Sequence, residues 1–338
     1  MSPQLSWQLF VNRYSLNVRT VCSDLGLTSN FTSSRNVGGT LARTGRPQAD
    51  IGIIGGSGLY EMVGMERVRE WRLTTPFGRP SDALLLGTID GVRVAFLARH
   101  GRGHRLNPSE INYQANIYAL KSVGVSRIIS VSAVGSMKET VKPGHLLFPD
   151  QFVDLTKQRV STFFRDGIVA HVAFGDPVCP DVRQALIHAS RAVGATIHEG
   201  GTYLCIEGPQ FSSKAESRLY RQWGVDVIGM TNMPEAKLAR EAEICYATMA
   251  LATDYDCWHE SEETVSVEMI LATLHKNVEL AKRVILGALS VAREPRNCLC
   301  GMALKHAIVT APTVIPQATR KKLDLLIGSY LPRTKGGR

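Results

Sequence analysis

The sequence contains no long apolar run. No stretch approaches the roughly 20 consecutive apolar residues that a helix needs to cross a bilayer, although 44% of the 338 residues are hydrophobic. With 20% charged and 7% aromatic residues, the composition is that of an ordinary globular protein. The sequence therefore argues against a helical membrane protein and predicts no membrane partner. A chain of this length can bury a large core within one α/β domain.

Acidic residues are almost missing from the first 49 positions, where Asp24 stands against five arginines. This segment carries +4 and residues 318–338 carry +5, which together account for the whole net charge of +9. A nucleic-acid-binding protein normally concentrates basic charge on its folded face. Because the excess here lies at the two ends of the chain, we predict no nucleic-acid partner.

Residues 1–49 are rich in Ser, Thr, Asn and Arg. This composition is typical of a disordered extension and also of an organellar targeting segment, and the sequence leaves both open. We predict an extension over residues 1–49, a single domain over 50–331 and a basic tail over 332–338. The expected location is the cytoplasm, with the nucleus included, and an organelle reached through the extension is the alternative.

The cysteines also lack the spacing of a metal-binding motif. The seven cysteines are irregularly spaced, and only Cys298 and Cys300 form a close pair. No second pair or histidine cluster accompanies them in the sequence, as a structural zinc site would require, so no metal ligand is predicted. Buried reduced thiols are the favoured interpretation, and a local Cys298–Cys300 disulfide is the alternative. Walker, GxGxxG and Gly-x-Ser-x-Gly motifs are absent as well.

Apolar runs with strand-like and helix-like periods alternate over residues 50–330, which predicts an α/β sandwich around a largely buried sheet. The predicted strands are residues 51–54, 83–89, 92–98, 127–131, 146–148, 203–206, 225–229 and 246–253. The predicted helices are residues 108–123, 180–193, 213–223, 234–243, 266–293 and 317–330.

Polar clusters follow several of these strands, where the sites of α/β folds gather. The first cluster combines the glycine-rich turn at 55–58 with Arg99, His100, Ser132 and Ala133. The backbone N–H groups of such a turn and the fork of an arginine can hold an oxyanion. The turn taken alone could be no more than a tight turn.

Two acids, Asp254 and Asp256, follow the strand predicted at 246–253. If the strand persists, both point to the same side, where mutual repulsion raises one pKa and makes a general acid available near neutrality. A solvated loop is the alternative. A third cluster, around Phe211 and Met230, could supply a stacking face and a soft wall for a purine nucleoside, or simply core packing.

Eight short motifs occur in order over about residues 50–330. They are GGSGL at 55–59, TPFG at 75–78, RHG at 99–101, NYQAN at 112–116, SAVGS at 132–136, EGPQF at 207–211, MT at 230–231 and ATDYD at 252–256. Jointly these motifs resemble the purine nucleoside phosphorylase family, in its methylthioadenosine phosphorylase branch. The resemblance implies the nucleoside phosphorylase fold, a three-layer α/β sandwich around a mixed β-sheet, assembled as a homotrimer.

The same resemblance implies an activity, which is the phosphate-dependent cleavage of S-methyl-5'-thioadenosine to adenine and 5-methylthioribose 1-phosphate. This reaction serves purine salvage and methionine salvage. The family uses inorganic phosphate as a co-substrate and needs no metal or organic cofactor.

Residue roles follow from matching positions in the family pattern. The resemblance implies a phosphate site formed by Ser57, Arg99, His100, Ser132, Ala133 and Thr231. It implies catalysis by Asp254 and Asp256, which face N7 and the 6-amino group of the purine. It implies that the nucleoside is contacted by Phe211, Met230, Thr253, Val267, Ile270, Leu271 and, from a neighbouring subunit, His171.

Three positions favour a 6-aminopurine with an apolar 5' group. Relatives that act on 6-oxopurines carry Asn where Asp254 stands, Glu where Ser212 stands and a ribose-binding His where Val267 stands. A carboxylate acceptor suits an exocyclic N–H donor and repels a 6-oxo group, and a valine wall favours a thioether over a hydroxyl. A phosphorylase of other specificity, a hydrolase and a non-catalytic purine-binding protein remain as alternatives.

Overall fold

The computed structural model describes residues 48–56, 59, 64–259 and 267–332, without the side chains of 267–272, 274 and 275. Its centre is an 11-stranded mixed sheet in which the strands run in the order β2-β3-β4-β1-β5-β10-β9-β7. The ten-residue strand β5 is the branch point, because β11 also pairs with it and leads on to β6 and β8. β5 is parallel to β1 and to β11, and antiparallel to β10.

The strands are β1 Ile51–Gly55, β2 Glu66–Trp71, β3 Leu84–Ile89, β4 Val92–Ala98, β5 Arg127–Ser136, β6 Leu146–Phe148, β7 Gln151–Asp154, β8 Ile197–Glu199, β9 Thr202–Cys205, β10 Val227–Gly229 and β11 Cys245–Asp254. The helices are α2 Tyr113–Ser122, α3 Pro180–Ala192, α4 Lys214–Gln222, α5 Asn232–Glu241, α6 Val267–Ala288 and α7 Gln317–Ile327. Three short 3₁₀ helices follow α6, which are η1 Leu289–Arg293, η2 Leu299–Met302 and η3 Pro312–Val314.

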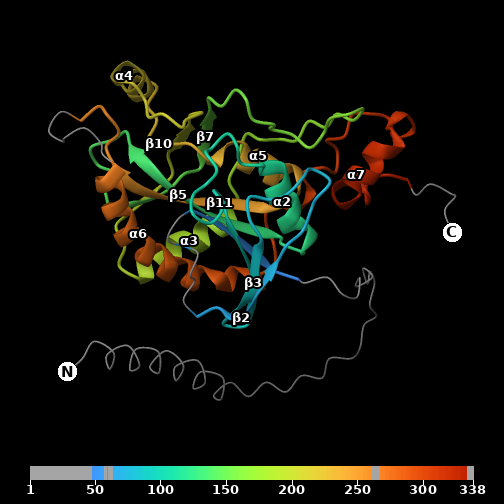
Figure 1. Cartoon of the computed structure of the whole chain (residues 1–338), viewed down its shortest axis with the longest axis horizontal. Helices are drawn as coiled ribbons and strands as arrows, with labels where there is room; N and C mark the ends of the chain where they lie inside the picture. The colour runs from blue at the N-terminus through green and yellow to red at the C-terminus, as the bar shows by residue number, and fades with distance from the viewer. Residues whose placement is uncertain (1–47, 57–58, 60–63, 260–266, 333–338) are drawn as a thin grey trace, which may run out of the picture. The chain divides into compact units, whose positions relative to one another are not determined.

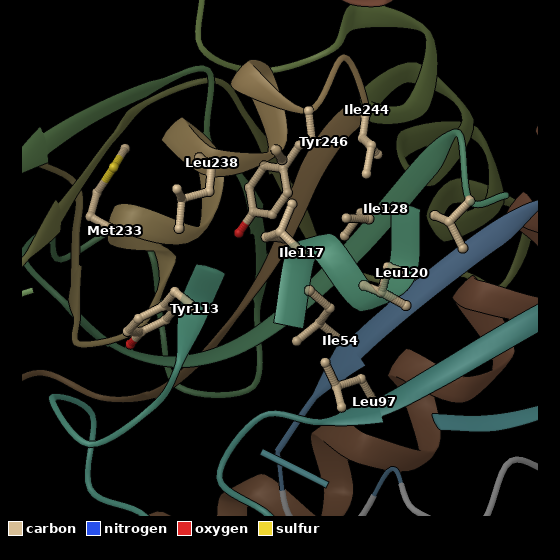
Figure 2. Packing of buried hydrophobic residues seen from close by; sticks show 14 of the residues in the cluster. Ile54, Leu97, Tyr113, Ile117, Leu120, Ile128, Met233, Leu238, Ile244 and Tyr246 are labelled. Atoms are coloured by element: carbon tan, nitrogen blue, oxygen red, sulfur yellow. The ribbon is translucent and has the colours of Figure 1, made fainter. Parts of the chain in front are cut away.

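Helices cover both faces of the sheet. Figure 1 shows α2 and α5 on one side of β5 and β11, and α3 and α6 on the other. Ile117 of α2 and Leu238 of α5 pack with the strand residues Ile54, Leu97 and Ile128 in one fully buried cluster (Figure 2). α3 and α6 pack on the opposite face in a second cluster. The predicted three-layer α/β sandwich is therefore confirmed.

The strands predicted at 83–89 and 92–98 pair as an antiparallel hairpin, with Asp90 and Gly91 both at positive φ in its turn. The helix predicted at 108–123 begins later than expected, because Asn112 provides its cap. The Asn112 side chain accepts the N–H of Ala115 at 3.0 Å, whereas the Ser109 hydroxyl donates to Glu207.

Three strands were not predicted from the sequence. β2 is exposed along five of its six residues, and β7 and β8 are short and only partly buried. Strands of this kind carry little apolar periodicity, which is the signal on which the prediction depended. Among the described helices, none is both long and apolar enough to cross a membrane.

Candidate active site

The carboxyl ends of β5, β10 and β11 surround a cavity of about 610 Å³. In β5 and β11, Ser132 pairs with Ala250, and Gly135 pairs with Asp254 after a register shift. Parallel pairing of the two long strands therefore brings the SAVGS and ATDYD motifs to the same edge of the sheet. The cavity is lined by, among others, Arg99, His100, Ser132, Ala133, Phe211, Met230, Thr231, Thr253, Asp254 and Asp256.

Among the remaining predicted residues, only His171 has a described side chain, and it does not line the cavity. Ser57 lies outside the described residues. Val267, Ile270 and Leu271 belong to the first turns of α6, whose side chains are not described. Further along the same helix, Val278 lines the cavity.

His171 lies away from the cavity of its own chain. It is exposed, and its backbone N–H is bonded to the Ala307 carbonyl at 2.8 Å. The family pattern assigns His171 to the site of a neighbouring subunit, and that assignment stays a prediction.

The two acids meet over Gly135, but not through simple strand alternation. β11 ends at Asp254, and Asp256 follows in a left-handed turn at φ 54°. A Cβ placed on Gly135 would lie 2.9 Å from Asp254 Oδ1 and 3.3 Å from the Asp256 Cβ. Glycine at this position therefore leaves the room that both acids occupy.

Hydrogen bonds fix Asp254 in place. Its Oδ2 accepts the Thr253 hydroxyl at 2.7 Å, and its Oδ1 accepts the Asp256 N–H at 2.8 Å. Burial raises the pKa of Asp256. The expectation that one acid of the pair has a raised pKa thus holds, but desolvation is the main cause rather than repulsion between the two carboxylates.

Hydroxyl groups gather at the other end of the cavity. Ser132 Oγ lies 3.0 Å from the Tyr203 hydroxyl and 3.3 Å from Thr231 Oγ1. Tyr203 was not selected from the sequence, because it falls within an apolar strand. The Tyr203 hydroxyl packs closely against Gly229, because a Cβ at that position would lie only 2.0 Å from the Tyr203 oxygen.

His100 is neutral at physiological pH, because burial lowers its pKa to about 4. Its Nδ1 lies 2.9 Å from the Leu106 carbonyl oxygen, which can only accept a hydrogen bond. Nδ1 therefore carries the ring proton, and Nε2 is left as an acceptor. Such a group suits the hydroxyl of a hydrogen phosphate ion.

Arg99 reaches the cavity as half of a buried ion pair. Its Nε and Nη2 donate to the two carboxylate oxygens of Glu235 at 2.8 and 3.0 Å, and further hydrogen bonds run to Ser130 and Val131. Both side chains are at most 2% exposed. Glu235, unlike Arg99, was not predicted from the sequence, because it lies in a helix without a distinctive motif. Its carboxylate neutralises the charge of the guanidinium.

Arg159 is a second buried arginine that the sequence did not reveal. With its side chain 1% exposed, it donates to the backbone carbonyls of Met230 and Glu207, both at 2.6 Å. Although burial opposes it, hydrogen bonds from the Lys157 N–H and the Ser109 hydroxyl lower the pKa of Glu207 to about 2. Through its hydrogen bonds to the Met230 and Glu207 carbonyls, Arg159 connects the two loops that carry Met230 and Phe211.

Phe211 and Ser212 stand out in the cavity wall, the first by its exposure and the second by its unbonded hydroxyl. Phe211 is 54% exposed, which is unusual for a large apolar side chain in a cavity wall. The Ser212 hydroxyl is buried and has no hydrogen-bond partner among the described residues. Burying a hydroxyl without a partner is costly, so a ligand that bonds to it would be favoured.

Comparison with known proteins decides the family. The model of the phosphorylase superfamily matches residues 50–290. The chain belongs to this superfamily.

Several similar proteins within the phosphorylase superfamily bear the name methylthioadenosine phosphorylase. S-methyl-5'-thioadenosine phosphorylases of Geobacter sulfurreducens and Koribacter versatilis are each 59% identical, over 83% and 86% of this chain and 99% of their own length. The crystal structure of a methylthioadenosine phosphorylase from an Antarctic soil metagenomic library is 53% identical with a TM-score of 0.80, covering 83% of this chain and 99% of that one. A Schistosoma mansoni methylthioadenosine phosphorylase in complex with adenine is 33% identical over 83% of this chain, with a TM-score of 0.71.

Proposed function

We propose that this chain cleaves S-methyl-5'-thioadenosine with inorganic phosphate, giving adenine and 5-methylthioribose 1-phosphate. The observation that carries the proposal is the cavity itself, which has the acids Asp254 and Asp256 at one end and the hydroxyls of Ser132 and Thr231 at the other. The first end suits a purine and the second an oxyanion. The relatives at 59% identity bear the name of this activity.

The reaction requires a proton on the purine as the bond from C1' to N9 breaks. We assign Asp254 to N7 and Asp256 to the 6-amino group, as the family pattern implies. Burial raises the pKa of Asp256, which is the direction that favours a proton on the pair. A proton passed to N7 improves the leaving group, and phosphate then stabilises the cationic sugar and attacks C1'.

The phosphate end relies on neutral donors and acceptors more than on free charge. Ser132 and Thr231 offer hydroxyls, and neutral His100 offers an acceptor for the phosphate hydroxyl. Arg99 has one N–H of its five outside the hydrogen bonds to Glu235, Ser130 and Val131. We assign that N–H to phosphate.

The decisive experiment compares S-methyl-5'-thioadenosine, adenosine and inosine as substrates, each with and without phosphate. We expect phosphate-dependent release of adenine from the first substrate and no cleavage of inosine, because the carboxylates at the base end repel a 6-oxo group. Equal rates without phosphate would identify a hydrolase. Binding without any turnover would identify a purine-binding protein.

We also infer a homotrimer in which His171 completes the 5' end of a neighbour's site. Mixing two impaired variants tests this arrangement of the trimer. His171→Ala and Asp254→Asn homotrimers are each expected to be impaired, but subunit exchange creates some sites with both residues intact. Recovery of activity after exchange supports the arrangement, whereas no recovery despite mixed trimers by native mass spectrometry contradicts it.

A further inference from the structure

The fold gathers four cysteines that the sequence keeps apart. The Sγ atoms of Cys179, Cys245, Cys298 and Cys300 all lie within 4.8 Å of one another. Cys298 and Cys300 form an isolated pair in the sequence but not in three dimensions. Cys179 and Cys245 provide the second pair.

Each cysteine comes from the end of an element. Cys179 is the N-cap of α3, Cys245 is the first residue of β11, and Cys298 and Cys300 belong to the start of η2. The backbone holds the first two firmly, since the Cys179 N–H donates to the Tyr246 carbonyl at 2.8 Å and the Cys245 N–H to the Ser126 carbonyl at 3.0 Å.

We propose that these four sulfurs bind one zinc ion as a tetrathiolate structural site. Zinc bound by four cysteines is tetrahedral, with metal–sulfur distances of about 2.3 Å and hence sulfurs roughly 3.8 Å apart. The cluster already has this size, and Cys245 and Cys298 are 3.3 Å apart as free thiols. A soft ion with four sulfur ligands and no open position is a closed, structural site.

Two features beside the cluster suit a metal bound by four thiolates. Cys179 is the N-cap of α3, so the positive end of the helix dipole lies next to its sulfur. The Arg296 side chain packs on Gly301, where a Cβ would lie 2.4 Å from its Nη2. A helix N-terminus and a nearby cation of this kind support metal-bound sulfur.

The site would act on stability and not on the reaction. β11 runs from Cys245 to Asp254, so at about 3.3 Å per residue the cluster lies roughly 30 Å from the catalytic acids. Cys179, Cys245 and Cys300 are buried, and Cys298 is half-buried. Zinc would therefore fasten the segment after α6 to the beginnings of α3 and β11, releasing the thiol protons as it binds.

Metal analysis of the full chain tests the proposal. Protein purified without affinity tag or chelator, under anaerobic reducing conditions, is expected to contain one zinc per chain by mass spectrometry of the elements. Cys298→Ala and Cys245→Ala should each lose most of it. Cys205→Ala is the matched control, because Cys205 is equally buried but outside the cluster, and it should keep the ion.

Spectroscopy and stability provide independent readouts. Cobalt added to the reduced, metal-free protein should give the intense visible absorption of a tetrahedral four-sulfur centre. Removing zinc should lower Tm while leaving the rate of phosphorolysis at moderate temperature unchanged. The proposal is overturned if the reduced chain takes up neither zinc nor cobalt, or if protein isolated anaerobically carries disulfides among these four cysteines by intact mass.

Discussion

At the scale of single residues, Asp254 and Asp256 have different environments, although only one residue separates them in the sequence. Asp254 ends a strand and accepts two hydrogen bonds, whereas Asp256 lies in a left-handed turn and has a raised pKa because it is buried. Hydrogen bonds orient the first, and burial shifts the pKa of the second upward.

Replacing Asp254 with Asn should lower turnover roughly 10²–10⁴-fold, the usual contribution of a positioned acid. A nucleoside already methylated at N7 carries the charge that protonation would create, so its cleavage should suffer less from the substitution. Steady-state kinetics with both substrates provides the measurement. Wild-type turnover of the unmethylated substrate by this variant would remove Asp254 from the mechanism.

Glu235→Gln should destabilise the protein by about 3–5 kcal/mol, because it leaves the buried charge of Arg99 without its partner. Phosphate can supply the missing negative charge, so it should raise Tm more in this variant than in the wild type. The control is Glu241→Gln on the same helix, where Glu241 bonds to Thr162 and Phe163 and not to Arg99. Equal phosphate shifts in all three proteins would mean that Arg99 does not contact the anion.

At the scale of elements, α5 connects the active site with the core. It begins beside Thr231, contributes Glu235 beneath the cavity and ends at Glu241. Burial raises the pKa of Glu241 to about 7 from an ordinary value of 4.5. The folded state therefore keeps this proton to higher pH than the unfolded state does.

Because the folded pKa of Glu241 is raised, its contribution is most favourable below pH 4.5 and is lost as the pH rises through 7. We expect the free energy of unfolding, compared with Glu241→Gln, to fall by about 3 kcal/mol across that range. Urea denaturation of both proteins at several pH values provides the measurement. A difference between them that does not change with pH would show that Glu241 ionises normally in the folded state.

At the scale of the whole molecule, the domain prediction separates residues 1–49 from the rest. The superfamily match begins at residue 50, and the relatives at 59% identity are covered almost completely by 83–86% of this chain. Activity should therefore not require the extension.

A chain that starts at Asp50 should keep the kcat, KM and Tm of the full-length protein within experimental error. Both forms carrying the same C-terminal fluorescent tag then report location. If the extension is a targeting segment, only the full-length chain reaches an organelle, and if it is not, the two forms distribute alike. Loss of activity on truncation would contradict the predicted boundary.

The sequence by itself determined the layer architecture and most of the cavity wall. Alternating apolar periods predicted the sandwich, because burying a sheet on both faces demands apolar strands and amphipathic helices. Motifs at strand ends predicted Ser132 and Asp254, because the parallel strands β5 and β11 deliver their carboxyl ends to one edge. Signals of both kinds are local, so they can be seen in a few consecutive residues.

Only the tertiary structure decided which distant residues act together. Glu235 under Arg99, Tyr203 behind Ser132 and the meeting of four cysteines depend on side chains from separate elements. None has a local pattern, because a buried tyrosine in a strand or a glutamate in a helix resembles any other in the sequence. Packing alone brings such groups within bonding distance, and it turned an apparently isolated Cys298–Cys300 pair into a cluster of four sulfurs.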